Sequence, residues 1–566
     1  MLLRRVTVEN FRTFSKIEVD LDETTVLIGE NNSGKSAFLE AIKFGLGRPL
    51  SRKVNPFEDY DYHLEKKGSK PGDSGEIKIT LKFIESRENE WSDDLVRALA
   101  DGVVFDGVLR KITLRVRSGK DAGSSELITD WDFLDAAGNP LGPKSKNLLA
   151  PLQRIRPLFF LSALRDAGKE FTSRSSFWAP FLKNHSIPEA LIKELEADLG
   201  ILNEKIIVAN TQLNSVRDRL AKAKDVLTVG SKDAVSIEAL PLRLWDMLSR
   251  AQVNIASTSG VVLPLTRHGA GTQSLSVILL FEAFIESALK QSYDDLAEPI
   301  LALEEPEAHL HPSATRVLWT ILSTLRGQKI IATHSGDLMS EVPIGAIRRF
   351  YRTEDTVETR RVQLQNLSAD ELRKIAFHVQ ASRGELFFAR CWLLAEGETD
   401  YWILSGAAKV LGINLEQVGI RIITFVLVSI VPLVKIANDL GIEWHCIADG
   451  DRAGQGYVRS IEPHLNGLSL TERVTVLPFD NMELLLCNSG FGGIYQNHIS
   501  AQKADRITVA EGHADYWKQV LDAQETNYKT RAAIEVIEEM KKQGQATVPK
   551  IIKDSLDRAL SLASIV

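Results

Sequence analysis

Residues 25–36 read TVLIGENNSGKS and contain the motif that decides the fold of the N-terminal half. A strand is expected at 25–28, a glycine-rich loop at 29–36 and a helix at 37–44. In a GxxxxGKS loop the backbone N–H groups turn towards phosphate oxygens, the lysine reaches the β- and γ-phosphates, and the serine binds Mg²⁺. The sequence therefore predicts an ATP site in an α/β fold. Its expected ligands are Gly29, Asn31, Asn32, Ser33, Gly34, Lys35 and Ser36, with Ser36 also a metal ligand.

Two later strands complete the expected nucleotide site. The apolar run 299–303 ends in Glu304 and Glu305, as a Walker B strand does. Glu304, in place of the more usual Asp, is expected on the metal side, and Glu305 is expected to polarise the attacking water. The strand 329–332 is followed by His334, for which a γ-phosphate-sensing role is favoured over a structural one.

Two more segments resemble ABC-type ATPases. Residues 267–274, RHGAGTQS, precede an apolar helix and resemble a divergent signature motif, whose helix N-terminus contacts the γ-phosphate bound by a partner protomer. Residues 9–14, ENFRTF, resemble the first strand of structural-maintenance-of-chromosomes (SMC) and Rad50 type ATPases, with Arg12 as a nucleotide contact. This resemblance implies a homodimer with ATP between the chains.

Acidic residues follow two strands of the C-terminal half. The strand 392–395 leads into Glu396, and the strand 444–448 leads into Asp449 and Asp451. The carboxyl ends of parallel strands share one edge of a sheet, so these three carboxylates are expected to lie together. Crowded carboxylates repel one another, and Mg²⁺ or Mn²⁺ resolves that repulsion and activates water for phosphodiester cleavage. A DGD turn alone is usually only a turn, but together these residues match the Toprim pattern.

Two further acids extend this expected metal site. Asp400 lies one helical turn after Glu396, so it faces the same side. Glu483 is a candidate ligand of a second metal, although a helix N-terminal interaction explains it nearly as well.

A basic residue is also expected near the scissile phosphate to offset developing charge. Candidates are Lys541, Lys542 and Lys550. Lys542 or its neighbour Lys541 is favoured as the catalytic lysine, and the sequence does not separate them. Lysines on a terminal helix are mostly solvated, which is the alternative for all three.

Composition limits the cellular setting. With 566 residues, 44% of them hydrophobic, the chain suits several soluble domains, and its net charge of −7 restricts nucleic-acid contacts to local basic patches. Three distant cysteines and no signal-peptide pattern favour the cytoplasm. The longest apolar run, 422–434, is too short to span a membrane and is expected to be a strand leading into a helix.

The expected domains follow these motifs. A charged helical pattern at 188–227 indicates a helical hairpin, with dimerisation and intramolecular packing equally favoured. The expected boundaries are 1–158 and 256–350 for the two ATPase parts, 159–255 for the helical insertion, 351–389 for a linker and 390–566 for the Toprim domain.

The combination of GENNSGKS, LEEPEAHLHP, EGETD and DGD resembles the overcoming-lysogenization-defect (OLD) family of ATP-dependent endonucleases over nearly the whole chain. The resemblance implies a two-metal nuclease that dimerises through its ATPase half, and a tetramer is a further assembly that the sequence allows. Gabija anti-phage nuclease subunits belong to this family, so a helicase-like partner protein and a defence role are also implied. The family's acidic positions match Glu396, Asp400, Asp449, Asp451 and Glu483.

The expected function is therefore an ATP-binding, divalent-metal-dependent DNA endonuclease. A topoisomerase or primase also uses Toprim metals, but a topoisomerase needs a tyrosine nucleophile on a DNA-binding domain, for which the nine scattered tyrosines give no sign. A non-catalytic ATP-dependent DNA clamp is the other alternative, and the intact acidic residues argue against it. Whether ATP is hydrolysed or sensed, and whether it activates or restrains cleavage, is left open by the sequence.

Overall fold

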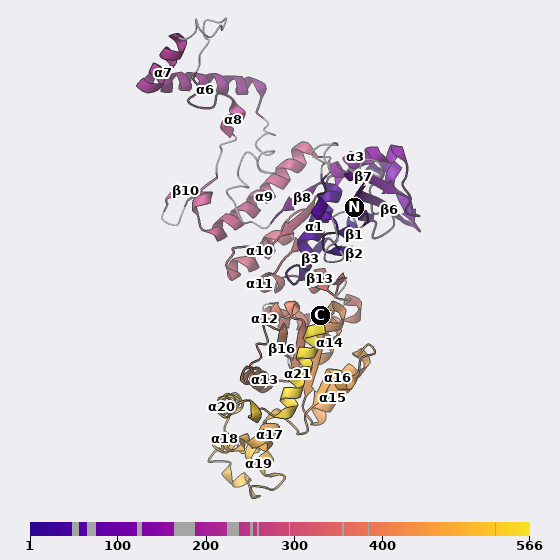
Figure 1. Cartoon of the computed structure of the whole chain (residues 1–566), viewed down its shortest axis with the longest axis vertical. Helices are drawn as coiled ribbons and strands as arrows, with labels where there is room; N and C mark the ends of the chain where they lie inside the picture. Colours follow the sequence, from indigo (N-terminus) through magenta and orange to yellow (C-terminus); the bar gives the residue numbers. More distant parts are fainter. Residues whose placement is uncertain are drawn as a thin grey trace. The chain divides into compact units, whose positions relative to one another are not determined.

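Figure 1 shows the helices and strands of the computed structural model. The structure divides into two compact units, each formed from more than one segment of the chain. The first comprises Met1–Gln153, Ile300–Glu304 and Pro312–Val566, and the second comprises Arg154–Pro299 and Glu305–His311. Most of the expected first ATPase part and the whole expected Toprim domain thus share one unit, whereas residues 256–299 and 305–311 of the expected second ATPase part belong to the other unit. The structure describes residues 1–47, 56–64, 75–120, 127–162, 187–222, 237–248, 253–256, 260–293, 295–353, 356–382, 384–426, 428–526 and 528–565.

An antiparallel sheet begins the first unit. Its strands have the order β2-β1-β4-β6-β5, and β7 pairs with β6. Alternate residues of β4 are buried, as its alternating apolar pattern predicts. The strands are β1 (Leu3–Phe11), β2 (Phe14–Asp20), β4 (Ile77–Ile84), β5 (Val104–Asp106), β6 (Leu109–Lys120) and β7 (Leu127–Leu134), and two short helices, α2 (Asp93–Ala98) and α3 (Leu149–Ile155), follow β4 and β7 in sequence.

A mainly parallel sheet carries the nucleotide loop. Its first-unit strands have the order β14-β13-β3-β12-β11, and only β14 is antiparallel to its neighbour. Helix α1 (Lys35–Leu46) contacts strands of both sheets. The buried Gln328 side chain also joins them, since it donates to the Leu3 carbonyl at 2.8 Å and accepts from the Leu3 N–H at 2.9 Å. The strands are β3 (Thr24–Gly29), β11 (Ile300–Glu304), β12 (Gln328–Ala332), β13 (Ile347–Arg352) and β14 (Val357–Arg360), with helices α10 (Pro312–Thr324) and α11 (Gly336–Met339).

The C-terminal domain is built on a parallel sheet with the order β16-β15-β17-β18. Helices α13, α20 and α21 bury their apolar residues with Cys391, Leu393 and Ala395 of β15, while α14 and α15 pack together against β17. The strands are β15 (Cys391–Ala395), β16 (Ile420–Thr424), β17 (Glu443–Ala448) and β18 (Val474–Val476). The helices are α12 (Ala369–Ala381), α13 (Glu398–Val410), α14 (Ile430–Leu440), α15 (Arg452–Ile461), α16 (Leu470–Arg473), α17 (Met482–Leu486), α18 (Gly492–Gln496), α19 (Tyr516–Asp522), α20 (Tyr528–Gln543) and α21 (Lys550–Ile565).

The sheets and the helices that pack on them confirm the α/β class expected from the sequence, with a strand–loop–helix unit at β3 and α1 and a second, parallel sheet in the C-terminal half. The apolar run 422–434 forms the end of β16 and the start of α14, as predicted. In the described part of the chain, no helix combines the length and the apolar character needed to cross a membrane.

The stretch 351–389, expected to be a linker, is folded instead. It contains β14, which pairs with β13, and α12, which contacts α14. Just before it, the buried Arg349 guanidinium donates to the carbonyl oxygens of Leu440 at 3.1 Å, Gly441 at 2.8 Å and Ala389 at 3.2 Å. These bonds attach the P-loop sheet to the C-terminal domain, and their acceptors are backbone atoms that leave no trace in the sequence.

The second unit contains the expected helical hairpin. Helices α6 and α7 contact one another, and Asn203 of α6 binds the backbone of Ile237 and Ala239. Leu191, Ile201, Leu202 and Val208 of α6 are exposed. Its elements are β8 (Leu158–Leu161), α6 (Glu189–Ala209), α7 (Thr211–Lys222), α8 (Leu244–Leu248), β9 (Asn254–Ala256), β10 (Val262–Pro264) and α9 (Ala270–Ser292).

Candidate active site and nucleotide loop

The nucleotide loop follows β3 directly and depends on its glycines. Gly29 has a φ of +149°, and a Cβ atom there would lie 2.2 Å from the Phe350 carbonyl oxygen. Gly34 has a φ of +94° and is the N-cap of α1. Larger residues would strain both positions. The loop backbone therefore has the conformation that only this glycine pattern accommodates well.

Lys35 lies inside this loop with 6% of its surface exposed. Its ammonium group donates to the carbonyl oxygens of Gly29 and Glu30, each at 2.9 Å, and to Ser33 Oγ at 3.3 Å. Phosphate oxygens are acceptors of the same kind, so the loop fits a nucleotide phosphate. The remaining loop candidates differ in burial: Ser33 is buried, and Asn31, Asn32 and Ser36 are exposed.

Two of the other predicted nucleotide ligands follow neighbouring strands. Glu304 ends β11 opposite Ala332 of β12, and the exposed His334 follows β12, which pairs in turn with β3. The sheet thus brings Glu304 and His334 to the edge from which the loop leaves. Glu305 begins the segment of the second unit that ends at His311, and its φ of +44° is unusual for a residue other than glycine.

The segments that resemble ABC-type ATPases have mixed outcomes. Helix α9 begins at Ala270 after the N-cap Gly269, which is inside the signature-like segment 267–274 that was expected to precede the helix. Arg12 forms ion pairs with Asp61, at 2.8 Å, and with Glu40. These carboxylates already engage the guanidinium that was expected to contact the nucleotide.

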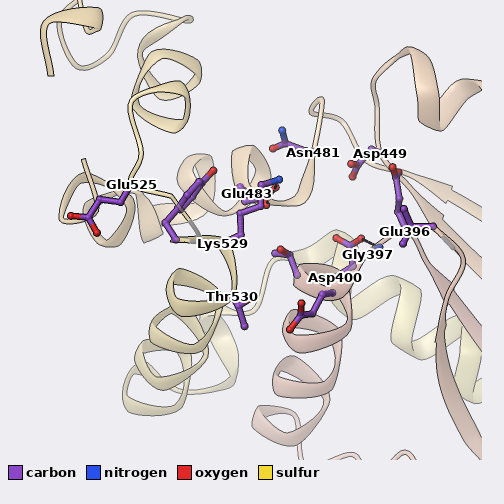
Figure 2. A pocket seen from close by; sticks show the side chains of 13 residues that line it. Glu396, Gly397, Asp400, Asp449, Asn481, Glu483, Glu525, Lys529 and Thr530 are labelled. Carbon is purple, nitrogen blue, oxygen red and sulfur yellow. Dashed lines mark hydrogen bonds and ion pairs between the residues drawn. The ribbon is translucent and has the colours of Figure 1, made fainter. Parts of the chain in front are cut away.

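A cavity of about 700 Å³ lies at the carboxyl ends of β15 and β17 (Figure 2). Because these strands are adjacent and parallel, the residues that follow them, Glu396 and Asp449, meet at one edge. Asp400 and Glu483 also line the cavity. The structure therefore places four of the five metal ligands predicted for the Toprim site along one cavity.

Asp451, the fifth, is placed beside the cavity and caps a helix. Its carboxylate accepts from the Gly454 N–H at 2.7 Å at the start of α15. Gly450 holds the turn in place, because its N–H donates to the Phe479 carbonyl at 3.0 Å and a Cβ atom there would lie 2.5 Å from the Leu477 carbonyl. Close packing thus fixes the acidic turn.

The cavity carries an excess of negative charge, since one lysine faces several carboxylates. Burial, followed by repulsion from Asp400 and Glu396, raises the pKa of Asp449 to about 8. Burial also raises the pKa of Asp400 to about 6, although its carboxylate accepts the Gly397 N–H at 2.9 Å. Burial, and then Asp400, raise the pKa of Glu396.

A divalent cation suits this donor set. Glu396 Oε2 is buried without a hydrogen-bond partner, and hard cations prefer carboxylate oxygens. Within the described residues, no three His, Cys, Asp or Glu side chains are grouped closely enough to form a ready metal site. The residues fit a metal in chemistry and charge, and their role as ligands stays a prediction.

Glu483 faces the cavity and does not cap its helix. The N-cap of α17 is Asn481, whose side chain accepts from the Leu484 N–H at 2.9 Å. Glu483 is 3% exposed, and its Oε1 lies 3.0 Å from Lys529 Nζ. Figure 2 shows the two side chains beside each other in the cavity. Asn481 is therefore the N-cap of α17, while Glu483 lies in the first turn of that helix and also faces the cavity, so its role as a metal ligand stays a prediction.

Lys529, which the sequence analysis missed, is the lysine that lines the cavity. It lies in the first turn of α20, whereas Lys542 lies in the last turn, about 20 Å further along the axis. Lys542 and Lys541 pair with Glu539 and Glu538 on the exposed surface. The structure thus places Lys529, and not Lys542, at the cavity, and no local motif in the sequence gives a signal for Lys529.

Comparisons with known proteins cover both halves of the chain. The family described as "Protein of unknown function (DUF2813)" matches residues 1–385, and the overcoming lysogenization defect protein-like Toprim domain matches residues 387–451. The uncharacterized protein YbjD of Escherichia coli (strain K12) is 29% identical over 100% of this chain and 99% of its own length. An OLD nuclease of Thermus scotoductus is 25% identical over 70% of this chain and 72% of its own length. The endonuclease GajA of Bacillus cereus is 22% identical, with coverages of 63% and 59%.

Proposed function

Because the chain belongs to the DUF2813 family and carries an OLD-like Toprim domain, we propose that it is a DNA endonuclease that cleaves phosphodiester bonds under nucleotide control. The main observation is the cavity where Glu396, Asp400, Asp449 and Glu483 meet at the carboxyl ends of β15 and β17. Structural carboxylates are normally paired, whereas Glu396 Oε2 is buried without a partner and only Glu483 of the four is paired with the cavity lysine, Lys529.

The cavity residues divide into two roles in this proposal. Glu396, Asp400, Asp449 and Glu483 would hold Mg²⁺ or Mn²⁺, with Asp451 supporting the turn between Asp449 and α15. Bound divalent ions supply an activated water and stabilise charge on the phosphate. Lys529 would bind the scissile phosphate, since its ammonium group reaches the cavity from the side of Glu483.

The nucleotide site would hold ATP through Lys35 and the loop backbone, with Glu304 and His334 near the phosphates. The relatives named OLD nuclease and endonuclease GajA support nuclease activity, and the proposal adds DNA as the substrate and anti-phage defence as the setting. Exposed apolar residues of α6 support dimerisation through the hairpin. An Ile201→Glu variant should then weaken the dimer in sedimentation experiments, and an unchanged dimer would exclude this surface.

The test is cleavage of supercoiled and linear DNA with Mg²⁺ or Mn²⁺, with and without ATP. We expect wild type to cut, Asp449→Asn to be inactive, and Lys35→Ala to lose the effect of ATP. Asp557→Asn, an exposed change on α21, is the matched control and should cut normally. If wild type never cuts, or Asp449→Asn cuts equally well, the second candidate, a non-catalytic ATP-dependent DNA clamp, becomes the better description.

A further inference from the structure

An ion pair connects the nucleotide loop to the C-terminal domain. Glu30 is the second residue of the loop, and Arg390 directly precedes β15. The two side chains form a two-pronged contact, in which Arg390 Nε meets Glu30 Oε1 and Nη2 lies 2.9 Å from Oε2. Two parallel bonds of this kind fix the relative orientation of the two groups better than a single contact does.

Arg390 is firmly attached to the C-terminal sheet. Its N–H donates to the Gly419 carbonyl at 2.8 Å, and its carbonyl accepts from the Glu443 N–H at 2.9 Å. Its aliphatic stem packs on Gly419, where an added Cβ atom would lie 2.9 Å from Arg390 Cγ. Arg390 therefore lies where β15, β16 and β17 begin, at the opposite edge from Glu396 and Asp449.

Glu30, at the other end of the pair, is sensitive to the state of the loop. Its carbonyl oxygen accepts from Lys35 Nζ at 2.9 Å. Phosphate oxygens would compete for this ammonium group, because binding phosphate is the role of the P-loop lysine. Occupancy of the loop thus acts directly on the backbone of the residue that holds Arg390.

The contacts next to the Glu30–Arg390 pair can stay in place while the pair itself rearranges. Gly29 packs against the backbone of Phe350. Arg349, the residue before Phe350 in β13, donates to three carbonyl groups of the C-terminal domain. These contacts are backbone-directed and buried. The Glu30–Arg390 pair, with side-chain exposures of 46% and 38%, has room to rearrange while they hold.

We propose that the Glu30–Arg390 ion pair transmits nucleotide occupancy of the loop to the acidic cavity by changing the position of β15. The proposal rests on the proposed function, in which Glu396 at the end of β15 belongs to the catalytic site. The strand between them has five residues, or about 17 Å, and buried parallel strands move as stiff units. Arg390 is a positioning residue in this scheme.

The first test replaces Arg390 by Met, which keeps the aliphatic stem and removes the charge. Arg421→Met is the matched control, because Arg421 lies in the neighbouring strand β16 and pairs with Glu385 and Glu416. Two ratios are measured: the DNA cleavage rate with and without ATP, and the ATP affinity with and without linear double-stranded DNA. The second ratio is informative because coupling between two binding sites is reciprocal.

We expect both ratios to move towards one in Arg390→Met, by about two- to fivefold. This is the fold-change that corresponds to the free energy of a partly exposed ion pair. Arg421→Met should keep the wild-type ratios. A double exchange, Glu30→Arg with Arg390→Glu, should restore part of the coupling. Wild-type ratios in Arg390→Met would overturn the proposal.

The two readouts separate this proposal from the proposed function. If no variant cuts DNA but the effect of DNA on ATP affinity depends on Arg390, the coupling stands and the nuclease assignment fails. If wild type cuts and ATP changes cleavage equally in wild type and Arg390→Met, the nuclease stands and this route is excluded.

Discussion

Lys529 and Lys542 occupy opposite ends of the same helix, and their surroundings differ. Lys529 Nζ lies 3.0 Å from the buried Glu483, while Lys542 pairs with the neighbouring Glu539 in solvent. Both are helical lysines in charged sequence, so their local patterns are alike. Only the return of α20 to the carboxyl ends of β15 and β17 distinguishes them.

Replacing Lys529 by Met should lower the single-turnover cleavage rate by about a hundredfold, because a donor aimed at the reacting phosphate is lost. Lys542→Met, on the same helix, should cut at the wild-type rate. Rates are compared at saturating DNA, so that weaker binding is not mistaken for slower chemistry. Equal rates for the two variants would remove Lys529 from the mechanism.

His445 of β17 is a buried residue with consequences for acid stability. Its Nδ1 lies 3.0 Å from the Glu472 carbonyl oxygen and its Nε2 lies 2.9 Å from Thr475 Oγ1. Burial lowers its pKa to about 4, helped by the nearby Arg558 and Arg473. The unfolded chain instead binds this proton near pH 6.5. Stability is therefore lost as the pH falls from about 6.5 towards 4.

When the pH is lowered from 7 to 5, the free energy of unfolding of wild type should fall by about 2 kcal/mol because of His445. His445→Gln removes this contribution, so its urea midpoint should fall less over that range. His513→Gln, a change at an exposed histidine, should keep the wild-type pH dependence. An identical pH dependence in His445→Gln and wild type would contradict the argument.

Among the elements, the turn between β17 and α15 is the most constrained by packing. Gly450 lies against the carbonyl groups of Leu477 and Phe479, and an added Cβ atom would approach them to 2.5 and 2.6 Å. Any side chain there must displace the turn that carries Asp449 and Asp451. Stability and cleavage are therefore linked at this position.

Gly450→Ala should destabilise the protein by about 2 kcal/mol and reduce cleavage. Gly456→Ala, within α15, has no atom within 4 Å of the added Cβ and should stabilise the helix by up to about 1 kcal/mol. Thermal unfolding of the two variants measures both changes in stability. A harmless Gly450→Ala substitution would show that the turn can relax.

Many of the helices and strands could be predicted from the sequence, because short-range patterns of apolar and polar residues determine them. The strand–loop–helix around Lys35 and the strands before Glu396 and Asp449 follow from apolar runs that end in polar motifs. The charged stretch 351–389 was misinterpreted as a linker, since β14 is only four residues long and its partner is β13. This stretch is folded because β14 pairs with β13, and the composition of the stretch gives no sign of that pairing.

For the whole molecule, Arg349 shows why the predicted domain boundaries differ from the compact units. Burial lowers its pKa to about 10, so it stays charged at neutral pH while it binds Leu440, Gly441 and Ala389. Its acceptors are carbonyl groups, which every residue has. A sequence pattern therefore cannot show that the P-loop sheet and the C-terminal domain are joined here.

Arg349→Met should leave these carbonyl groups buried without donors and cost about 3 kcal/mol. Hydrogen exchange of the β15 and β17 amides should accelerate, because the strands begin beside Ala389 and Gly441. Arg352→Met, at the exposed end of β13, should leave exchange unchanged. Unchanged protection in Arg349→Met would mean that other contacts suffice to hold the domains together.

The three cysteines, Cys391, Cys446 and Cys487, are all buried. Burial raises the pKa of the Cys391 and Cys487 thiols to about 12 and that of Cys446 further. Thiol reagents react with the thiolate, so the native protein should resist maleimide and iodoacetamide labels. A single cysteine introduced on its surface would then carry a fluorophore or spin label selectively, without first removing the natural ones. The packing of the C-terminal domain thus leaves the folded protein ready for site-specific spectroscopy.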